Sequence, residues 1–163
     1  ALTENGLPEP LPANLNLVRQ FNFAGAKAAA VDGFTKDTGV LFTSQHGHGW
    51  QRDITINQRQ RGRSPLLADT YLFTRTHDTW ECALHNGTYT VTLSIGDAAY
   101  KQFGQNAKVE GTIDFKNHTT LIGRFAEKTL EVEVRDGRLT VEIGLKGSKT
   151  NTCLNWLRIA KPD

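Results

Sequence analysis

The feature that most constrains the fold is an alternation of apolar and polar residues that recurs along the chain, with almost no helical period. It is clearest in the segment WECALHNGTYTVTLSIGD at 80–97. Alternation with a period of two is typical of half-buried strands, and the Asn86-Gly87 pair between the two runs favours a type I′ turn. The segment therefore predicts a β-hairpin whose inward side chains are Trp80, Cys82, Leu84, Tyr89, Val91, Leu93 and Ile95.

Other short extended segments lie on both sides of this one. Asp136-Gly137 predicts a second hairpin turn, whereas Ser44–Trp50 and Asp97–Asn106 have the composition of loops. About ten short strands separated by turn signals predict an all-β fold, an antiparallel β-sandwich with jelly-roll connections. The remaining predicted strands are Leu17–Phe23, Val40–Thr43, Asp69–Thr74, Lys108–Phe115, Thr119–Phe125, Leu130–Val134, Leu139–Ile143 and Cys153–Ile159.

The length of 163 residues predicts one folded domain at 17–163. Residues 1–16 contain Pro8, Pro10 and Pro12, which is typical of a linker or an extended strap over the surface. No apolar run approaches the roughly 20 residues needed to span a bilayer. A start at Ala1 without Met is what a mature secreted chain would show, so we expect an extracellular location.

The two cysteines and the basic residues each leave two interpretations open. Cys82 and Cys153 both occupy apparent core-facing positions, so they form either one disulfide or two buried thiols. The net charge of +2 is too balanced to indicate a nucleic-acid partner. The run QRQRGR at 58–63 is either a solvated loop or a surface that contacts anions.

Catalytic and metal-binding motifs are weak in this sequence. The chain has no G-x-S-x-G nucleophile motif and no strand–helix alternation, which argues against a serine hydrolase. His46 and His48 have a spacing that can support metal contact, but a third ligand would have to come from a distant residue such as His77 or Asp78. The enzyme alternative is therefore a small lyase or hydrolase that uses His46 or His48 with Tyr100 as acid and base.

Aromatic residues in loops are a stronger indication. An exposed ring can stack on the C–H face of a sugar while neighbouring polar groups bond its hydroxyls. Trp50 and Tyr100 are the two main candidates, and each ring either contacts a ligand or folds back to cap the core. Trp156 is either buried between the layers or lies on a concave ligand face.

Several motifs follow one another in a fixed order along the chain, namely Phe21–Phe23, Gly47–Trp50, Leu84–Leu93, Gly96-Asp97, Asp136–Leu139 and Asn155–Ile159. This ordered set resembles the malectin-like and galactose-binding-like β-sandwich modules of secreted bacterial polysaccharide-degrading enzymes. The resemblance covers nearly the whole chain after about Leu17, and it implies a non-catalytic carbohydrate-binding module with a ligand site in loops at one end of the sandwich.

The resemblance also implies a pattern of site residues, aromatic on three loops and polar just before the final strand. The matching positions are Tyr71, Asp97, Tyr100-Lys101 and Thr150-Asn151, with Lys101 in place of an aromatic and Thr150 in place of an acid.

Related modules hold a structural calcium through an early acid and an Asp two residues after the final-strand Asn. This chain has Leu157 at the second place, so calcium stays open only through loop carbonyls and Asp32 or Asp37.

We therefore predict a secreted, monomeric, non-catalytic module that binds a polysaccharide or oligosaccharide and targets a linked catalytic domain to it, with no nucleic-acid or membrane partner. The basic run favours an acidic glycan, a uronate or a sulfated one, because guanidinium matches carboxylate and sulfate geometry. The alternatives are a structural or interaction domain of an extracellular multidomain enzyme, and the small enzyme described above. The predicted ligand-binding residues are His48, Trp50, Arg59, Arg61, Tyr71, Tyr100, Lys101 and Asn151.

Overall fold

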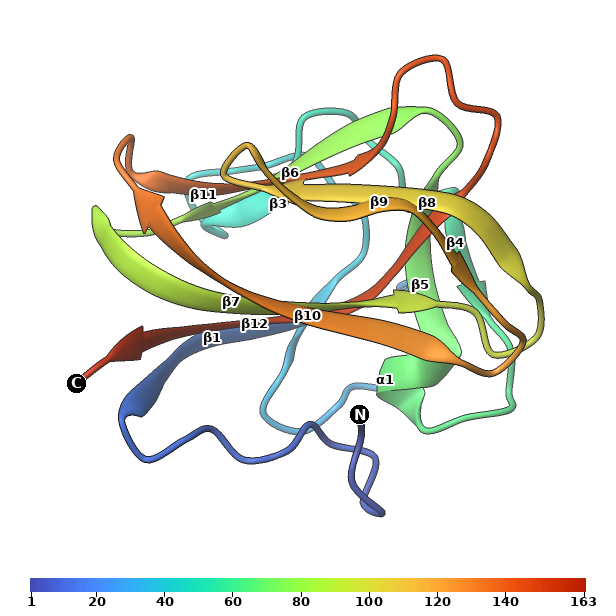
Figure 1. Ribbon diagram of the computed structural model, residues 1–163, viewed down its shortest axis with the longest axis horizontal. Helices are drawn as coiled ribbons and strands as arrows, with labels where there is room; N and C mark the ends of the chain where they lie inside the picture. Colours follow the sequence, from blue (N-terminus) through green and yellow to red (C-terminus); the bar gives the residue numbers. More distant parts are fainter.

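The computed structural model describes residues 1–163 and consists of two β-sheets packed face to face (Figure 1). Every strand pair is antiparallel except β1 with β2, and the all-β sandwich predicted from the sequence is confirmed. Sheet 1 has the strand order β10 (Phe125–Val134), β7 (Gly87–Gly96), β12 (Thr152–Pro162), β1 (Leu15–Phe23), β2 (Thr35–Asp37). Two further strands of this sheet branch from β12, which also pairs with β5 (Thr70–Thr74), and β5 in turn pairs with β4 (Gln58–Gln60). Sheet 2 has the order β3 (His48–Trp50), β6 (His77–Ala83), β11 (Arg138–Gly144), β8 (Gln102–Val109), β9 (Thr112–Thr120).

The main core lies between the two sheets and is built from the alternating residues that the sequence indicated. Trp80 and Cys82 of β6 face inward, as predicted, and Leu84 packs partly buried against the same cluster. The inward residues of β7 are Tyr89, Val91, Leu93 and Ile95. The only helix, α1 (Leu66–Asp69), has four residues and is therefore too short to span a bilayer.

Both predicted hairpins are wrong, because each turn connects the two sheets instead of two neighbouring strands. β6 and β7 lie in different sheets, and so do β10 and β11. Asn86 is not among the residues with positive φ, so it cannot form a type I′ turn with Gly87. Its side-chain amide instead bonds the second connection, donating to the carbonyl of Arg135 (2.9 Å) and accepting from the backbone N–H of Gly137 (2.8 Å).

The tight hairpin of this fold lies at Glu110-Gly111, inside a segment predicted as one strand. Both residues have positive φ, 49° and 75°, as a type I′ turn requires, and Val109 pairs directly with Thr112. The strand predicted over Lys108–Phe115 is therefore two strands. The segment predicted as the loop Ser44–Trp50 ends in β3, since three of its residues pair with β6.

Residues 1–14 precede β1 and lie along the outer face of sheet 1, where Gly6 and Pro8 are buried (Figure 1). Arg158 of β12 donates a hydrogen bond to the carbonyl of Glu9 (2.8 Å). β1 begins at Leu15, two residues before the expected start of the domain at Leu17, and the boundary itself stays a prediction.

The two cysteines are free and buried in separate clusters, so the disulfide alternative is wrong. Cys82 belongs to the main core, whereas Cys153 packs with Tyr71 and Phe73 in a small cluster on the other face of β5 and β12. Burial raises the pKa of the Cys82 thiol to about 11.

Candidate functional site

Trp50 and His48 lie inside the fold, where they hold a buried carboxylate. Trp50 is 1% exposed, and its indole N–H donates to Asp37 Oδ1 (2.9 Å). The indole of Trp80 donates to the other oxygen of Asp37 (2.8 Å), and His48 Nδ1 lies 2.7 Å from that oxygen. Neither Trp50 nor His48 is open to a ligand in this structure, so we assign both side chains to the core.

The same cluster decides whether the calcium implied by the resemblance fits this chain. The Asp37 carboxylate already accepts from four N–H groups, those of Gly39, His48, Trp50 and Trp80. Leu157 is fully buried and offers no oxygen from its side chain. No three His, Cys, Asp or Glu side chains lie close enough together to share a metal ion. Asp37 and Leu157 therefore do not fit the ligand positions of a bound calcium.

His46 and His48 lie at the opposite end of sheet 2 from Tyr100. They therefore do not form the acid–base pair of the enzyme alternative. His48 pairs with Cys82, which in turn pairs with Leu139 at the start of β11. The end of β11 pairs with β8 through Ile143 and Ala107, and Tyr100 precedes β8 beyond this point.

Three of the predicted residues, Arg61, Tyr71 and Tyr100, meet around a buried acid at the other end of the sandwich. Arg61 donates two hydrogen bonds to Asp97, from Nε (3.0 Å) and Nη2 (2.9 Å). The Tyr71 hydroxyl (2.9 Å) and Gln102 Nε2 (2.9 Å) donate to Asp97 Oδ2 as well. Burial alone would raise the pKa of Asp97, but these hydrogen bonds outweigh it and leave the pKa below its ordinary value.

This buried network carries an exposed aromatic ring. The Arg61 guanidinium lies over the Tyr100 ring at 4.7 Å from its centroid, and Tyr100 is 58% exposed. Phe103 on the same segment is 54% exposed and carries the Lys101 ammonium at 4.6 Å from its centroid. Each ring has a cation against it. Sequence reasoning missed Phe103, although its place in the loop with Tyr100 was the signal that could have found it.

Asn151 and Arg59 lie near this cluster without joining it. The neighbours of Asn151 bond the start of β8: Thr150 Oγ1 donates to the carbonyl of Gly104 (2.8 Å), and Asn106 N donates to Thr152 Oγ1 (3.0 Å). Asn151 therefore borders β8, the strand that contains Phe103. Arg59 lies over the Phe73 ring at 5.1 Å, further along the face of β5 than Tyr71.

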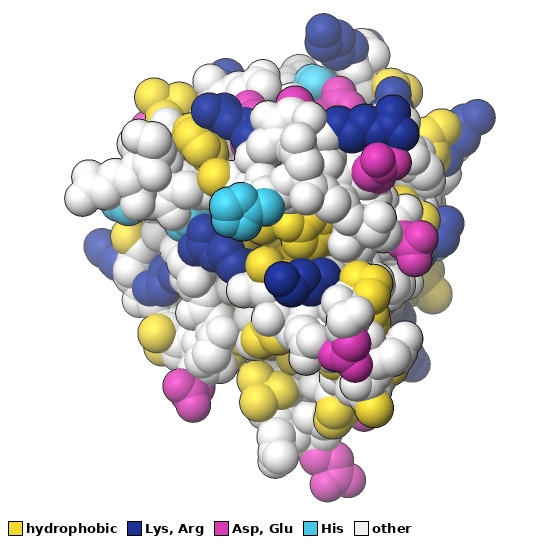
Figure 2. Space-filling model, turned by 90° about the vertical axis from the view of Figure 1, so that its left-hand side faces the viewer, with side chains coloured by type: hydrophobic (Ala, Val, Ile, Leu, Met, Phe, Trp, Pro, Cys, Tyr) yellow, Lys and Arg dark blue, Asp and Glu magenta, His cyan; other side chains and the backbone are white.

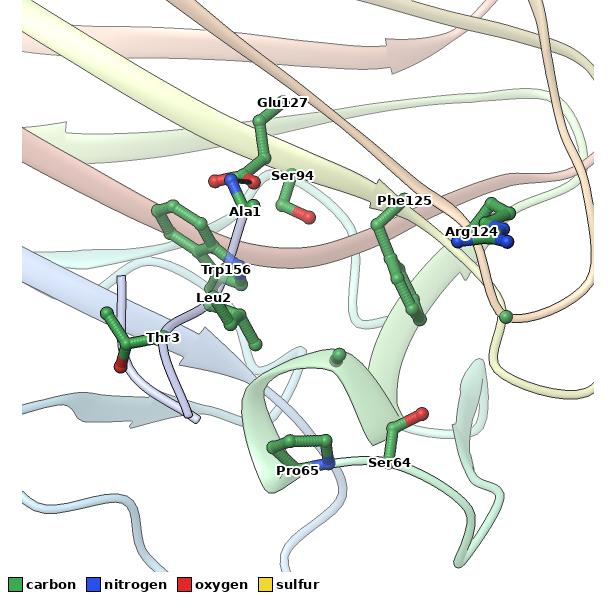
Figure 3. A pocket seen from close by; sticks show the side chains of 12 residues that line it. Ala1, Leu2, Thr3, Ser64, Pro65, Ser94, Arg124, Phe125, Glu127 and Trp156 are labelled. Carbon is green, nitrogen blue, oxygen red and sulfur yellow. Dashed lines mark ion pairs between the residues drawn. The ribbon is translucent and has the colours of Figure 1, made fainter. Parts of the chain in front are cut away.

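A hollow of about 620 Å³ adjoins the cluster on the outer face of sheet 1 (Figure 3). Trp156 and Ser94 line it from the sheet, and Phe125 and Arg124 stand at its side. Trp156 points away from the core and is only 2% exposed, so it is neither between the layers nor open on a ligand face. The turn 121–124 separates this hollow from Asp97, whose carbonyl accepts the N–H of Gly123 (3.0 Å).

The hollow at the opposite end of the sandwich is lined by none of the predicted residues. Figure 2 shows this end, where hydrophobic side chains at the centre are surrounded by Lys, Arg and His side chains. A hollow of about 450 Å³ there is lined by residues that include Val18, Leu84, Tyr89, Arg19, His85 and Lys161.

Comparisons with known proteins agree on the fold. No family model matches the sequence. A curated relative, β-agarase A of Zobellia galactanivorans, is 27% identical over 152 residues, covering 85% of this chain and 26% of the relative. Among solved structures, the YXIM protein of Bacillus subtilis has a TM-score of 0.67 with 22% identity, covering 88% of this chain and 39% of that one.

The ANX2 ectodomain of Arabidopsis thaliana has a TM-score of 0.60 with 14% identity and covers 91% of this chain and 50% of its own. The chain thus spans half or less of each protein named here. The likeness to the plant ectodomains agrees with the resemblance read from the motifs. The chain therefore has the same β-sandwich fold as these solved structures.

Proposed function

We propose that this domain is a non-catalytic carbohydrate-binding module, extracellular, that holds a linked glycan-degrading enzyme on its polysaccharide. The observation that carries the proposal is the exposed ring of Tyr100, fixed by Arg61 and the buried Asp97. The similarity to part of a protein named as an agarase supports the link to a polysaccharide-degrading enzyme. Tethering raises the effective concentration of an enzyme on a polymer even when the module binds weakly.

The geometry supports stacking of a sugar ring on Tyr100. Arg61 occupies one face of the phenol ring, which leaves the other face and the edge for the C–H groups of a sugar. The ring is held in place before binding, so little conformational entropy is lost when a ligand orders it. Because Asp97 neutralises Arg61, this part of the surface suits an uncharged sugar ring.

Affinity electrophoresis against a panel of neutral polysaccharides tests the proposal. We expect retardation by at least one polymer, and Tyr100→Ala should weaken it about tenfold, corresponding to roughly 1.4 kcal/mol. Trp50→Phe is the control: it removes a buried N–H that bonds Asp37 and should lower stability without changing affinity. The affinity of the variant Phe125→Ala tests whether the hollow of about 620 Å³ also contacts the glycan.

Each of three results would contradict the proposal. Shortening of a polysaccharide by the purified chain would show that it is an enzyme. Binding that Tyr100→Ala leaves unchanged would place the site elsewhere. If no polysaccharide binds, the exposed residues Tyr100, Phe103, Leu121 and Ile122 would fit the alternative of a structural domain with a neighbouring domain against this end.

A further inference from the structure

A third hollow, lined by three arginines, lies on the outer face of β4 and β5. It has a volume of about 480 Å³ and is lined by Arg52, Ile56, Asn57, Arg59, Phe73, Arg75 and Thr76. We propose that this arginine hollow binds an anionic substituent, a carboxylate or a sulfate, of the glycan that stacks on Tyr100. The inference rests on the proposed function and adds the charge class of the ligand.

Two of the three guanidinium groups converge on one aromatic ring. Arg59 lies over the Phe73 ring at 5.1 Å and Arg75 at 5.5 Å from its centroid. Phe73 itself is 3% exposed, so the guanidinium groups cover it and face the hollow. They reach the ring from different segments, Arg59 from β4 and Arg75 from the connection that follows β5.

The charges of these two arginines are not neutralised within the protein. Arg52 forms a bidentate ion pair with Asp78, at 2.9 Å and 2.8 Å. Neither Arg59 nor Arg75 forms an ion pair, and the one hydrogen bond of the Arg59 side chain goes to the carbonyl of Gln58 (2.7 Å). Two like charges over one ring repel each other, and an anion between them would remove that repulsion. Guanidinium also matches carboxylate and sulfate oxygens in a bidentate geometry.

The hollow and the Tyr100 ring belong to one continuous row of side chains. Tyr71 and Phe73 lie on the same face of β5, with ring centroids 5.9 Å apart. Arg61 lies over both Tyr71 (5.6 Å) and Tyr100 (4.7 Å). A polymer that stacks on Tyr100 can therefore extend along Arg61 towards Arg59 and Arg75.

The surroundings favour a glycan over a nucleic acid. Binding of unpaired bases relies on exposed aromatic rings, and the ring in this hollow is covered by its own arginines. Ile56 stands at the rim and is 85% exposed, which offers an apolar contact for the C–H face of a sugar.

The test compares polymers that differ chiefly in charge. The probes are polygalacturonate with its methyl-esterified form, and a sulfated galactan with neutral agarose, each by affinity electrophoresis at about 50 mM and about 500 mM salt. The wild-type protein should bind at least one charged polymer about tenfold more tightly than its neutral counterpart at low salt. High salt should remove most of this difference.

The variant Arg59→Gln/Arg75→Gln should lose the preference for the charged polymer and keep the affinity for the neutral one. The matched control is Arg63→Gln/Arg135→Gln, which removes the same charge from exposed arginines outside the hollow and should keep the preference. Tyr100→Ala should weaken binding to both members of a pair. Thermal unfolding of each variant checks that it remains folded.

The outcomes separate this inference from the proposed function. Binding to neutral polymers without any preference for charge, or equal losses in both double variants, would overturn the arginine hollow and leave the carbohydrate-binding role standing. Absence of binding to every polymer would overturn both. Tighter binding to a single-stranded DNA oligonucleotide than to any glycan, lost in Arg59→Gln/Arg75→Gln, would assign the hollow to nucleic acid.

Discussion

Asp97 and Asp114 are both buried, yet their surroundings are opposite. Asp97 accepts hydrogen bonds from Arg61, Tyr71 and Gln102, so it stabilises the fold above its ordinary pKa and loses that contribution as the pH falls through its lowered value. Asp114 is 1% exposed, and neither of its oxygens has a hydrogen-bond partner. It sits at a bulge where β9 shifts register against β8.

The burial of the Asp114 carboxyl predicts that the stability of the fold depends on pH. Burial raises its pKa to about 6, against a smaller opposing effect of Lys128. Below the ordinary value of 3.8 the group is protonated in both the folded and the unfolded chain. As the pH rises from there to about 6, the unfolded chain ionises first, so the folded state loses stability. Asp114→Asn should therefore raise the free energy of unfolding near pH 7.5 by about 1–3 kcal/mol, and should bring no such gain near pH 3.5.

Urea unfolding followed by tryptophan fluorescence at both pH values measures this difference. Asp136→Asn is the control, since Asp136 is exposed and its substitution should have little effect at either pH. An effect of Asp114→Asn that is equal at both pH values would show that the carboxyl is not destabilised by burial.

At the scale of elements, turns decide which strands meet. Gly111 closes the hairpin between β8 and β9 with φ of 75°, and a Cβ there would meet no atom within 4 Å. Gly144 ends β11 with φ of 81°, and a Cβ there would lie 2.1 Å from the carbonyl oxygen of Thr76. A side chain at position 111 would be strained only by the backbone conformation. A side chain at position 144 would also clash with the connection between β5 and β6.

Alanine substitutions should separate these two costs. Gly111→Ala should lower the free energy of unfolding by about 1 kcal/mol, the cost of the left-handed conformation. Gly144→Ala should lower it by more than about 2 kcal/mol, because backbone must move as well. Chemical denaturation of the two variants beside the wild-type chain measures the difference. Equal losses would mean that the Thr76 connection moves aside freely.

The same elements show how far the sequence could predict the structure. Alternation identified the inward residues of β6 and β7, because side-chain direction along a strand is a local property. It could not show that the Asn86-Gly87 turn crosses between sheets, because sheet membership depends on β10, β11 and β12.

Site residues follow the same division. Tyr100 could be found as an aromatic residue in a polar loop. The burial of Trp50 could not, because it depends on Asp37 and Trp80, which come from other parts of the chain.

At the scale of the whole molecule, each thiol lies inside a different packed cluster. Burial raises the pKa of both thiols, so the reactive thiolate is scarce in the folded protein. We expect no change in Tm on adding a reductant, and labelling by a thiol reagent only as the chain unfolds in urea. In the variant Cys153→Ala only the Cys82 thiol remains, so the labelling of each cysteine can be assigned. Fast labelling of folded protein, or a Tm lowered by reductant, would contradict the separate burial of the two residues.

The pairing of β1 with β12 joins the first strand to the last, with Phe21 opposite Leu157. A ribosome adds about 5–20 residues per second, so roughly 7–27 s separate the synthesis of these two residues. During that interval β1 can find only the short parallel partner β2, which is made soon after it. Sheet 1 can therefore be completed only after β12 has been synthesised. A nascent chain of this domain therefore exposes apolar strand surface until its final segment leaves the exit tunnel, and it is during synthesis that it most needs a chaperone.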